Sequence, residues 1–133
     1  MRIVFMGTPD FAIPSLEKLL QSVHEVVGVV TAPDRPAGRG QQLRPSPIKA
    51  FAQAHALPVL QPIKLRNPEF IQALKDLQPD LAVVVAFRML PEMVWSIPSR
   101  GTLNLHAALL PDYRGAAPRN WDIINGETNT GAT

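Results

Sequence analysis

LAVVVAF, residues 81–87, decides the fold class, because all seven of its side chains are apolar. Half-buried strands alternate apolar and polar residues, whereas a continuous run of Val and Ala is typical of a parallel strand that is covered on both faces. We therefore predict a buried strand here. Four further segments are predicted as strands around it: RIVFM (2–6), HEVVGVVT (24–31), PVLQP (58–62) and GTLNLHAALL (101–110).

Amphipathic segments stand between these strands. Their apolar spacing predicts helices over residues 11–22, 48–57, 67–78, 91–97 and 117–126. Asn67 and Pro68 are a typical helix start, with Asn67 as the expected N-cap. The alternation of strand and helix predicts an α/β fold with a doubly wound, mostly parallel sheet. Ligands of such sheets bind beyond the carboxyl ends of the strands, so functional residues are expected there.

Composition narrows the class of protein. The 133 residues are 46% apolar and 18% charged, which suits one domain with a real core. The absence of cysteine excludes disulfides and thiolate metal sites, and the three scattered histidines form no recognisable metal motif. No apolar run approaches the roughly 20 residues that span a bilayer, and no secretory signal is visible, so we expect a soluble cytoplasmic protein without membrane association. The first turn, GTPDFA, is not a dinucleotide-binding glycine motif.

One long window carries only positive charge. Residues 35–68 contain six Lys and Arg side chains and no Asp or Glu. Within it, residues 33–47 hold too much Pro and Gly for a helix or a central strand. A solvated surface explains such a window, and a polyanionic partner such as nucleic acid is the alternative.

Asn104 and His106 interrupt the last predicted strand. Residues two apart in a strand point to the same face, so both side chains are expected to face one ligand. An Asn amide can donate to a developing oxyanion, and a His can donate or move a proton. The pair suits attack on a carbonyl-like carbon, with a carboxylate expected as third group. The alternative is a buried polar pair that neighbouring backbone satisfies.

These residues also carry a family resemblance. NLH (104–106) followed by LLPDYRGAAP (109–118) resembles the core motif of the folate-dependent formyltransferases. RIVFMGTPDFA (2–12) is similar to the opening of methionyl-tRNA formyltransferases. APDRPAGRGQQLRPSPIK (32–49) resembles the inserted loop that separates them from their relatives, and INGETNTGAT (124–133) resembles the start of their next strand. Four motifs in the family's order make the resemblance specific.

The resemblance implies a monomer with a Rossmann-like formyltransferase fold, which transfers a formyl group from 10-formyltetrahydrofolate to the amine of methionyl initiator tRNA. Asn104 and His106 match the catalytic Asn and His, and no metal is implied. Folate contacts fall on residues Phe87, Arg88, Met89, Leu90, Ala108, Leu109, Leu110 and Pro111. The expected tRNA contacts are Arg35, Arg39, Arg44 and Lys49.

This sequence departs from the family pattern in three ways. Ala108 stands where the family usually has Ser, and Arg88 stands where most methionyl-tRNA formyltransferases have Gly. The family's catalytic Asp lies beyond Thr133. We therefore expect residues 1–133 to be an incomplete N-terminal catalytic domain, truncated before its last strands, without the C-terminal tRNA-binding barrel and inactive alone.

Two other functions remain open at this point. A formyltransferase that acts on a small amine, such as glycinamide ribonucleotide or an amino sugar, would use Asn104 and His106 in the same way but would not need the basic loop. A non-catalytic RNA- or folate-binding module is the other alternative, in which Asn104 and His106 would have no chemical role.

Overall fold

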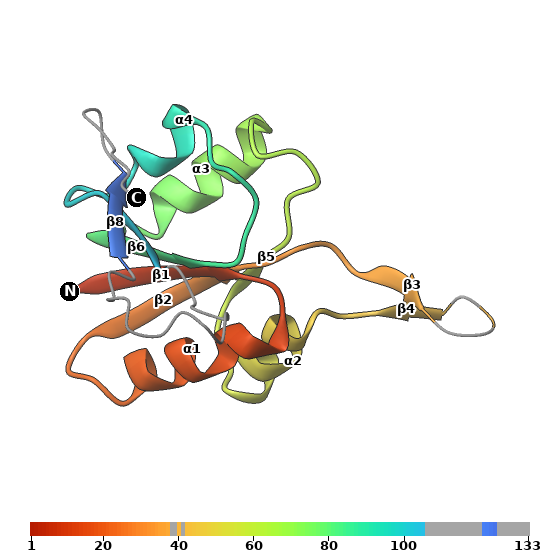
Figure 1. Ribbon diagram of the computed structural model, residues 1–133. Coiled ribbons are helices and arrows are strands. Elements are labelled where there is room, and N and C mark those ends of the chain that lie inside the picture. The colour runs from red at the N-terminus through yellow and green to blue at the C-terminus, as the bar shows by residue number, and fades with distance from the viewer. Residues whose placement is uncertain (38–39, 41, 106–120, 125–133) are drawn as a thin grey trace, which may run out of the picture.

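The computed structural model describes residues 1–37, 40, 42–105 and 121–124, and a six-stranded sheet runs through its centre (Figure 1). The strand order is β5-β2-β1-β6-β7-β8. The first five strands in this order are mutually parallel, and β8 is antiparallel to β7. The strands are β1 (Arg2–Gly7), β2 (Glu25–Val30), β5 (Val59–Leu60), β6 (Leu81–Val85), β7 (Thr102–Leu105) and β8 (Trp121–Ile124).

Helices cover both faces of this sheet (Figure 1). A short 3-10 helix η1 (Asp10–Ala12), α1 (Ile13–Leu20) and α2 (Pro47–Ala54) pack on one face. The helices α3 (Pro68–Asp76) and α4 (Glu92–Trp95) pack on the other. The predicted doubly wound, mostly parallel α/β architecture is confirmed.

The central strands are apolar on both faces because each face meets its own helical layer. In β1, Ile3 and Phe5 join the core with α1 and α2, whereas Val4 and Met6 join the core with α3 and α4. None of these four side chains is more than 1% exposed. The continuous apolar run that predicted β6 has the same cause, since its residues also divide between the two cores.

Side-chain caps start two of the helices. The Asn67 side-chain oxygen accepts hydrogen bonds from the backbone N–H groups of Glu69 and Phe70, at 2.7 and 3.2 Å, which confirms the predicted cap of α3. The Ser46 hydroxyl accepts from the backbone N–H of Lys49 at 3.0 Å and caps α2 in the same way. Such caps satisfy backbone donors that the first helical turn leaves free.

The segment 121–124 differs from the prediction. The helix that we expect over 117–126 is wrong for these four residues, because Trp121–Ile124 form β8 and pair with Thr102–Leu105. The segment contains Trp and two Ile, which fit a pleated surface well. Pairing with the edge of β7 therefore outweighs a helical spacing that is only a weak preference.

The Pro- and Gly-rich segment forms a separate two-stranded ribbon. Its strands β3 (Arg35–Ala37) and β4 (Gln42–Arg44) are antiparallel and belong to no other sheet among the described residues. We call this β3–β4 pair the basic ribbon. It projects away from the central sheet (Figure 1). The prediction that the segment is neither helix nor central strand is confirmed for its described residues up to Ser46, whereas Pro47 is the first residue of α2.

Candidate functional site at the carboxyl ends of the strands

A groove lies at the carboxyl ends of β1, β2 and β6, where the chain reverses its direction of travel across the sheet. From β1 the chain moves outward through β2 to β5 and then returns to the other side of β1 as β6. Open α/β sheets bind ligands at such a switch point. The groove has a volume of about 550 Å³, and its lining comprises Thr8, Ala32, Pro33, Arg35, Ile63, Ala86, Phe87 and Arg88.

The tight approach of β1 and β6 beneath this groove requires a glycine. A Cβ atom added at Gly7 would lie 2.8 Å from the carbonyl oxygen of Val85 and 3.0 Å from the Phe5 ring. The first of these atoms belongs to backbone and cannot rotate away. The absence of a side chain at Gly7 therefore lets both strand ends meet directly below the groove.

The loop after β6 carries the residues expected to contact folate. Its first residue, Ala86, has a positive φ of 55°, so the chain turns sharply as the strand ends. Phe87 and Arg88 line the groove. Met89 is 91% exposed, whereas Leu90 is buried in the core with α3 and α4. The four expected residues thus divide between groove wall, open surface and core.

Arg88 ties this loop to the segment that follows β5. Its guanidinium donates hydrogen bonds to the carbonyl oxygens of Ile63 at 2.9 Å and Pro62 at 2.8 Å. The same guanidinium lies 4.9 Å from the centre of the Phe87 ring. Burial and, to a smaller degree, the positive charge of Arg35 lower the pKa of Arg88. Because its donors serve backbone carbonyls, Arg88 fixes the wall between this groove and a neighbouring one of about 540 Å³, which Arg88, Met89 and Leu90 also line.

Asn104 lies near the carboxyl end of β7, opposite Val84 of β6, and is partly exposed. This is the edge of the sheet where the sequence predicts the reaction. The other residues of that motif, His106, Ala108, Leu109, Leu110 and Pro111, lie outside the described residues.

The cations expected to contact tRNA have different surroundings. Arg35 and Arg44 are both exposed and stand directly opposite each other in the basic ribbon. Residues directly opposite in an antiparallel pair lie about 5 Å apart at Cβ, so two like charges repel there. In contrast, the Lys49 ammonium forms an ion pair with Asp34. Arg39 lies outside the described residues.

Sequence reasoning misses the partners of Lys49. Both carboxylate oxygens of Asp34 accept from the Lys49 Nζ at 3.1 Å, and the Gln61 side-chain amide donates to Asp34 Oδ1 at 2.8 Å. These hydrogen bonds, the one from Gln61 before that from Lys49, hold the pKa of Asp34 below its usual range, against the opposing effect of burial. Nothing in the spacing of these residues signals the cluster, since Asp34 and Gln61 stand 27 positions apart.

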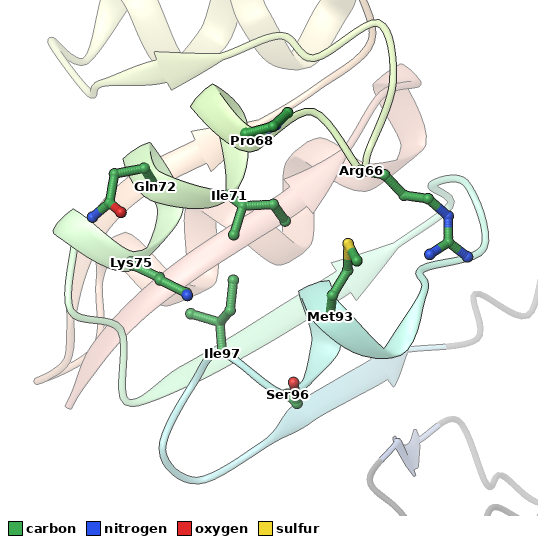
Figure 2. A pocket seen from close by; sticks show the side chains of 8 residues that line it. All are labelled: Arg66, Pro68, Ile71, Gln72, Lys75, Met93, Ser96 and Ile97. Atoms are coloured by element: carbon green, nitrogen blue, oxygen red, sulfur yellow. The ribbon is translucent and has the colours of Figure 1, made fainter.

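A larger groove of about 750 Å³ lies between α3 and α4 (Figure 2). Arg66 and Lys75 stand at its two ends, and Ile71 and Ile97 face each other across it (Figure 2). None of the expected site residues that the structure describes belongs to its lining. The smaller groove lies at the strand ends and is lined by the expected residues Arg35, Phe87 and Arg88, so it is favoured as the candidate site.

Two further properties concern the described part of the chain. Its His, Asp and Glu side chains come together nowhere in a group of three that could hold a metal ion. None of its helices is long and apolar enough to cross a membrane.

Comparison with known proteins identifies the family. The formyl transferase family profile matches residues 1–133, the whole chain. The chain belongs to the formyl transferase family.

Curated relatives of this formyl transferase chain are similar over its full length. The methionyl-tRNA formyltransferase of Bacteroides fragilis is 60% identical over 133 residues, which are all of this chain and 41% of that protein. The methionyl-tRNA formyltransferase of Geobacter sulfurreducens is 59% identical over 134 aligned positions, which cover 100% of this chain and 42% of that protein. The chain thus spans about two fifths of the length of these relatives.

Solved structures share the fold at much lower identity. Phosphoribosylglycinamide formyltransferase from Coxiella burnetii matches with a TM-score of 0.55 and 21% identity, over 86% of this chain and 55% of that one. The same enzyme from Anaplasma phagocytophilum matches with a TM-score of 0.59 and 18% identity, over 86% and 53%. These likenesses confirm the Rossmann-like formyltransferase fold of this family member.

Proposed function

We propose that residues 1–133 belong to an enzyme that transfers a formyl group from 10-formyltetrahydrofolate to the α-amine of methionyl initiator tRNA. The observation that carries this proposal is the identity of about 60% to methionyl-tRNA formyltransferases along the entire chain. The groove at the strand ends and the exposed basic ribbon beside it support the proposal physically.

The proposed reaction is a direct transfer. The methionyl amine attacks the formyl carbon, and the carbonyl oxygen becomes an oxyanion in a tetrahedral intermediate. The Asn104 amide donates a hydrogen bond to this oxyanion, and protonated His106 assists it. Collapse of the intermediate breaks the bond between the formyl carbon and the folate nitrogen, which takes a proton as it leaves. By the family resemblance, an Asp beyond Thr133 completes this constellation.

In the proposal, folate contacts the loop after β6 and, by the family resemblance, residues 108–111. A pterin needs a largely apolar pocket with a few polar groups at fixed positions. The Phe87 ring and the exposed Met89 side chain provide apolar surface beyond the carboxyl end of β6, the strand that pairs with Asn104's strand β7. The bonds from Arg88 to Pro62 and Ile63 support the shape of this surface.

The basic ribbon is the proposed contact with the acceptor end of the tRNA. Arg35 and Arg44 repel each other in the free protein, and an RNA phosphate between or beside them would relieve this repulsion. Arg35 also lines the groove at the strand ends, so one residue belongs to both surfaces. This arrangement favours an acceptor that is a polyanion over a small amine.

The test is formyl transfer to charged initiator tRNA by the complete gene product, with the double variant Arg35→Ala and Arg44→Ala beside the parent. We expect the KM for tRNA to rise and its logarithmic salt dependence to weaken by about one unit per lost phosphate contact. The double variant Lys75→Ala and Arg100→Ala is the matched control, since it removes two exposed cations that line neither the ribbon nor the grooves beside Arg88. Equal effects of both double variants, or no effect of the first, would remove the ribbon from the interface.

Residues 1–133 alone are assayed in parallel and are expected to be inactive. Transfer by this piece would show that the group beyond Thr133 is dispensable. If the complete gene product transfers formyl groups to a small amine but not to tRNA, the small-amine alternative replaces the proposal. Folate binding without transfer to any amine would favour the non-catalytic module.

A further inference from the structure

The two ends of the basic ribbon meet at a cluster of polar side chains. The chain enters β3 through Thr31 and Asp34 and leaves β4 through Ser46 into α2. The Thr31 and Ser46 hydroxyl oxygens lie 2.7 Å apart, and the Thr31 side chain is fully buried. This bond closes the ribbon at its base across 15 positions of sequence.

A second set of bonds closes the same base on its outer side. Lys49 in the first turn of α2 donates to both oxygens of Asp34, and Gln61 after β5 donates to Asp34 and to the carbonyl oxygen of Ala32. The Lys49 side chain is only 17% exposed and that of Asp34 30%, so the pair is held between elements rather than free in solvent. We call the side chains of Thr31, Asp34, Ser46, Lys49 and Gln61 the basal clasp.

The pairing within the basic ribbon does little to fix the direction in which the ribbon points. Each of its strands has three residues, and three residue pairs join them in the part of the ribbon that the structure describes. All three residues of β4 are exposed, and the opposed Arg35 and Arg44 repel each other. An isolated two-stranded ribbon of this kind is marginally stable by itself. Its orientation must therefore come from its base.

We propose that Asp34 and Lys49 are positioning residues, which hold the basic ribbon so that Arg35 and Arg44 meet the anionic acceptor beside the groove. This inference rests on the proposed function. It also changes the role of Lys49, from the direct tRNA contact that the sequence suggests to a partner of Asp34. Arg35 follows Asp34 immediately in the chain and lines the groove, so fixing the position of Asp34 also fixes the backbone of Arg35.

The substitution Asp34→Asn distinguishes the two roles of Lys49 by the sign of its effect. In the complete gene product, we expect the KM for tRNA to rise by about tenfold, because a tenfold change corresponds to the loss of one charge-assisted hydrogen bond. The kcat at saturating tRNA and the KM for formyl-folate are expected to stay near the parent values. If Lys49 instead contacts phosphate directly, removing the carboxylate frees it, and the KM for tRNA falls. A fall, or no change, overturns the proposal.

Asp76→Asn is the matched control. Asp76 also accepts from a Gln side chain, Gln72, at 2.8 Å, but it lies on the exposed surface of α3 away from the ribbon. We expect this variant to match the parent in all three kinetic constants. A rise in KM for tRNA equal to that of Asp34→Asn would overturn the proposal, because it would show that losing such a carboxylate raises the KM wherever the carboxylate lies.

Combination with the ribbon variant tests whether the clasp acts through the arginines. In the background of Arg35→Ala and Arg44→Ala, the substitution Asp34→Asn is expected to add little to the KM for tRNA, because the groups that it positions are gone. Fully additive effects would overturn the positioning role.

Amide hydrogen exchange measures, without tRNA, how strongly the basal clasp holds the ribbon. Asp34→Asn, and the nearly isosteric Thr31→Val, are expected to speed amide exchange in peptides that cover residues 35–44, while peptides from residues 81–85 exchange as in the parent. Unchanged exchange in the ribbon overturns the clasp, whatever the kinetics show. If Arg35→Ala and Arg44→Ala leave the KM for tRNA unchanged, the proposed function fails instead, and the two failures are thus distinguishable.

Discussion

The central sheet and the basic ribbon use the same backbone pairing but are stabilised by different forces. In β1 the side chains from Ile3 to Met6 are at most 1% exposed, and two helical layers press on them. In the ribbon, Leu43 is 66% exposed, and arginines stand opposite each other. Burial therefore fixes the sheet, whereas polar bonds at its base fix the ribbon. The molecule thus combines a densely packed sheet with an outlying ribbon that polar bonds join to it at the base.

The largest expected difference between the two regions is in the free energy of unfolding, when a Leu is replaced by Ala in each. Leu16→Ala removes a fully buried side chain from the core under α1, and we expect a loss of about 2–5 kcal/mol in the free energy of unfolding. Leu43→Ala in the ribbon is expected to change it by less than about 0.5 kcal/mol. Urea unfolding of both variants measures the contrast. A loss above about 1.5 kcal/mol for Leu43→Ala would mean that the ribbon is part of the cooperative core.

A smaller difference is expected between two helix caps. Ser46→Ala and Asn67→Ala each remove an N-cap acceptor, and each is expected to cost about 1 kcal/mol of stability. Only Ser46 also bonds Thr31 at the base of the ribbon. Amide exchange of residues 35–44 should therefore quicken in Ser46→Ala and stay at the parent rate in Asn67→Ala. Equal ribbon exchange in the two variants would contradict the separate anchoring of the ribbon.

The smallest expected effect on stability concerns the opposed arginines. Arg44→Glu converts repulsion with Arg35 into attraction, which is expected to stabilise the ribbon locally by a few tenths of a kcal/mol and to slow its amide exchange. Arg44→Gln, which removes the repulsion alone, should fall between this variant and the parent. The KM for tRNA is expected to rise from the parent to Arg44→Gln and further to Arg44→Glu. If exchange slows while the KM for tRNA stays unchanged, the opposed arginines have no role in binding.

The candidate site was predictable in part. The carboxyl ends of the strands follow from the order of apolar runs, so the loop at Phe87 and the position of Asn104 could be expected from sequence. The resemblance added roles for Asn104 and His106, but the commitment of the Arg88 guanidinium to Pro62 and Ile63 has no signature in sequence. The segment 121–124 was predicted wrongly, because its strand pairing involves β7, which lies outside the local window in which helical spacing is judged.

The layered α/β architecture follows from the amino-acid sequence alone, since apolar periodicity and helix caps act over a few neighbouring residues. The helices α2 and α3 start at the caps Ser46-Pro47 and Asn67-Pro68. The strands β1 and β6 are buried because no polar side chain interrupts their apolar runs. The direction of the basic ribbon and the ion pair of Lys49 with Asp34 depend instead on how distant elements pack. Asp34, Lys49 and Gln61 come from three different elements, and bonds between such groups depend on how the elements pack rather than on their spacing in the chain.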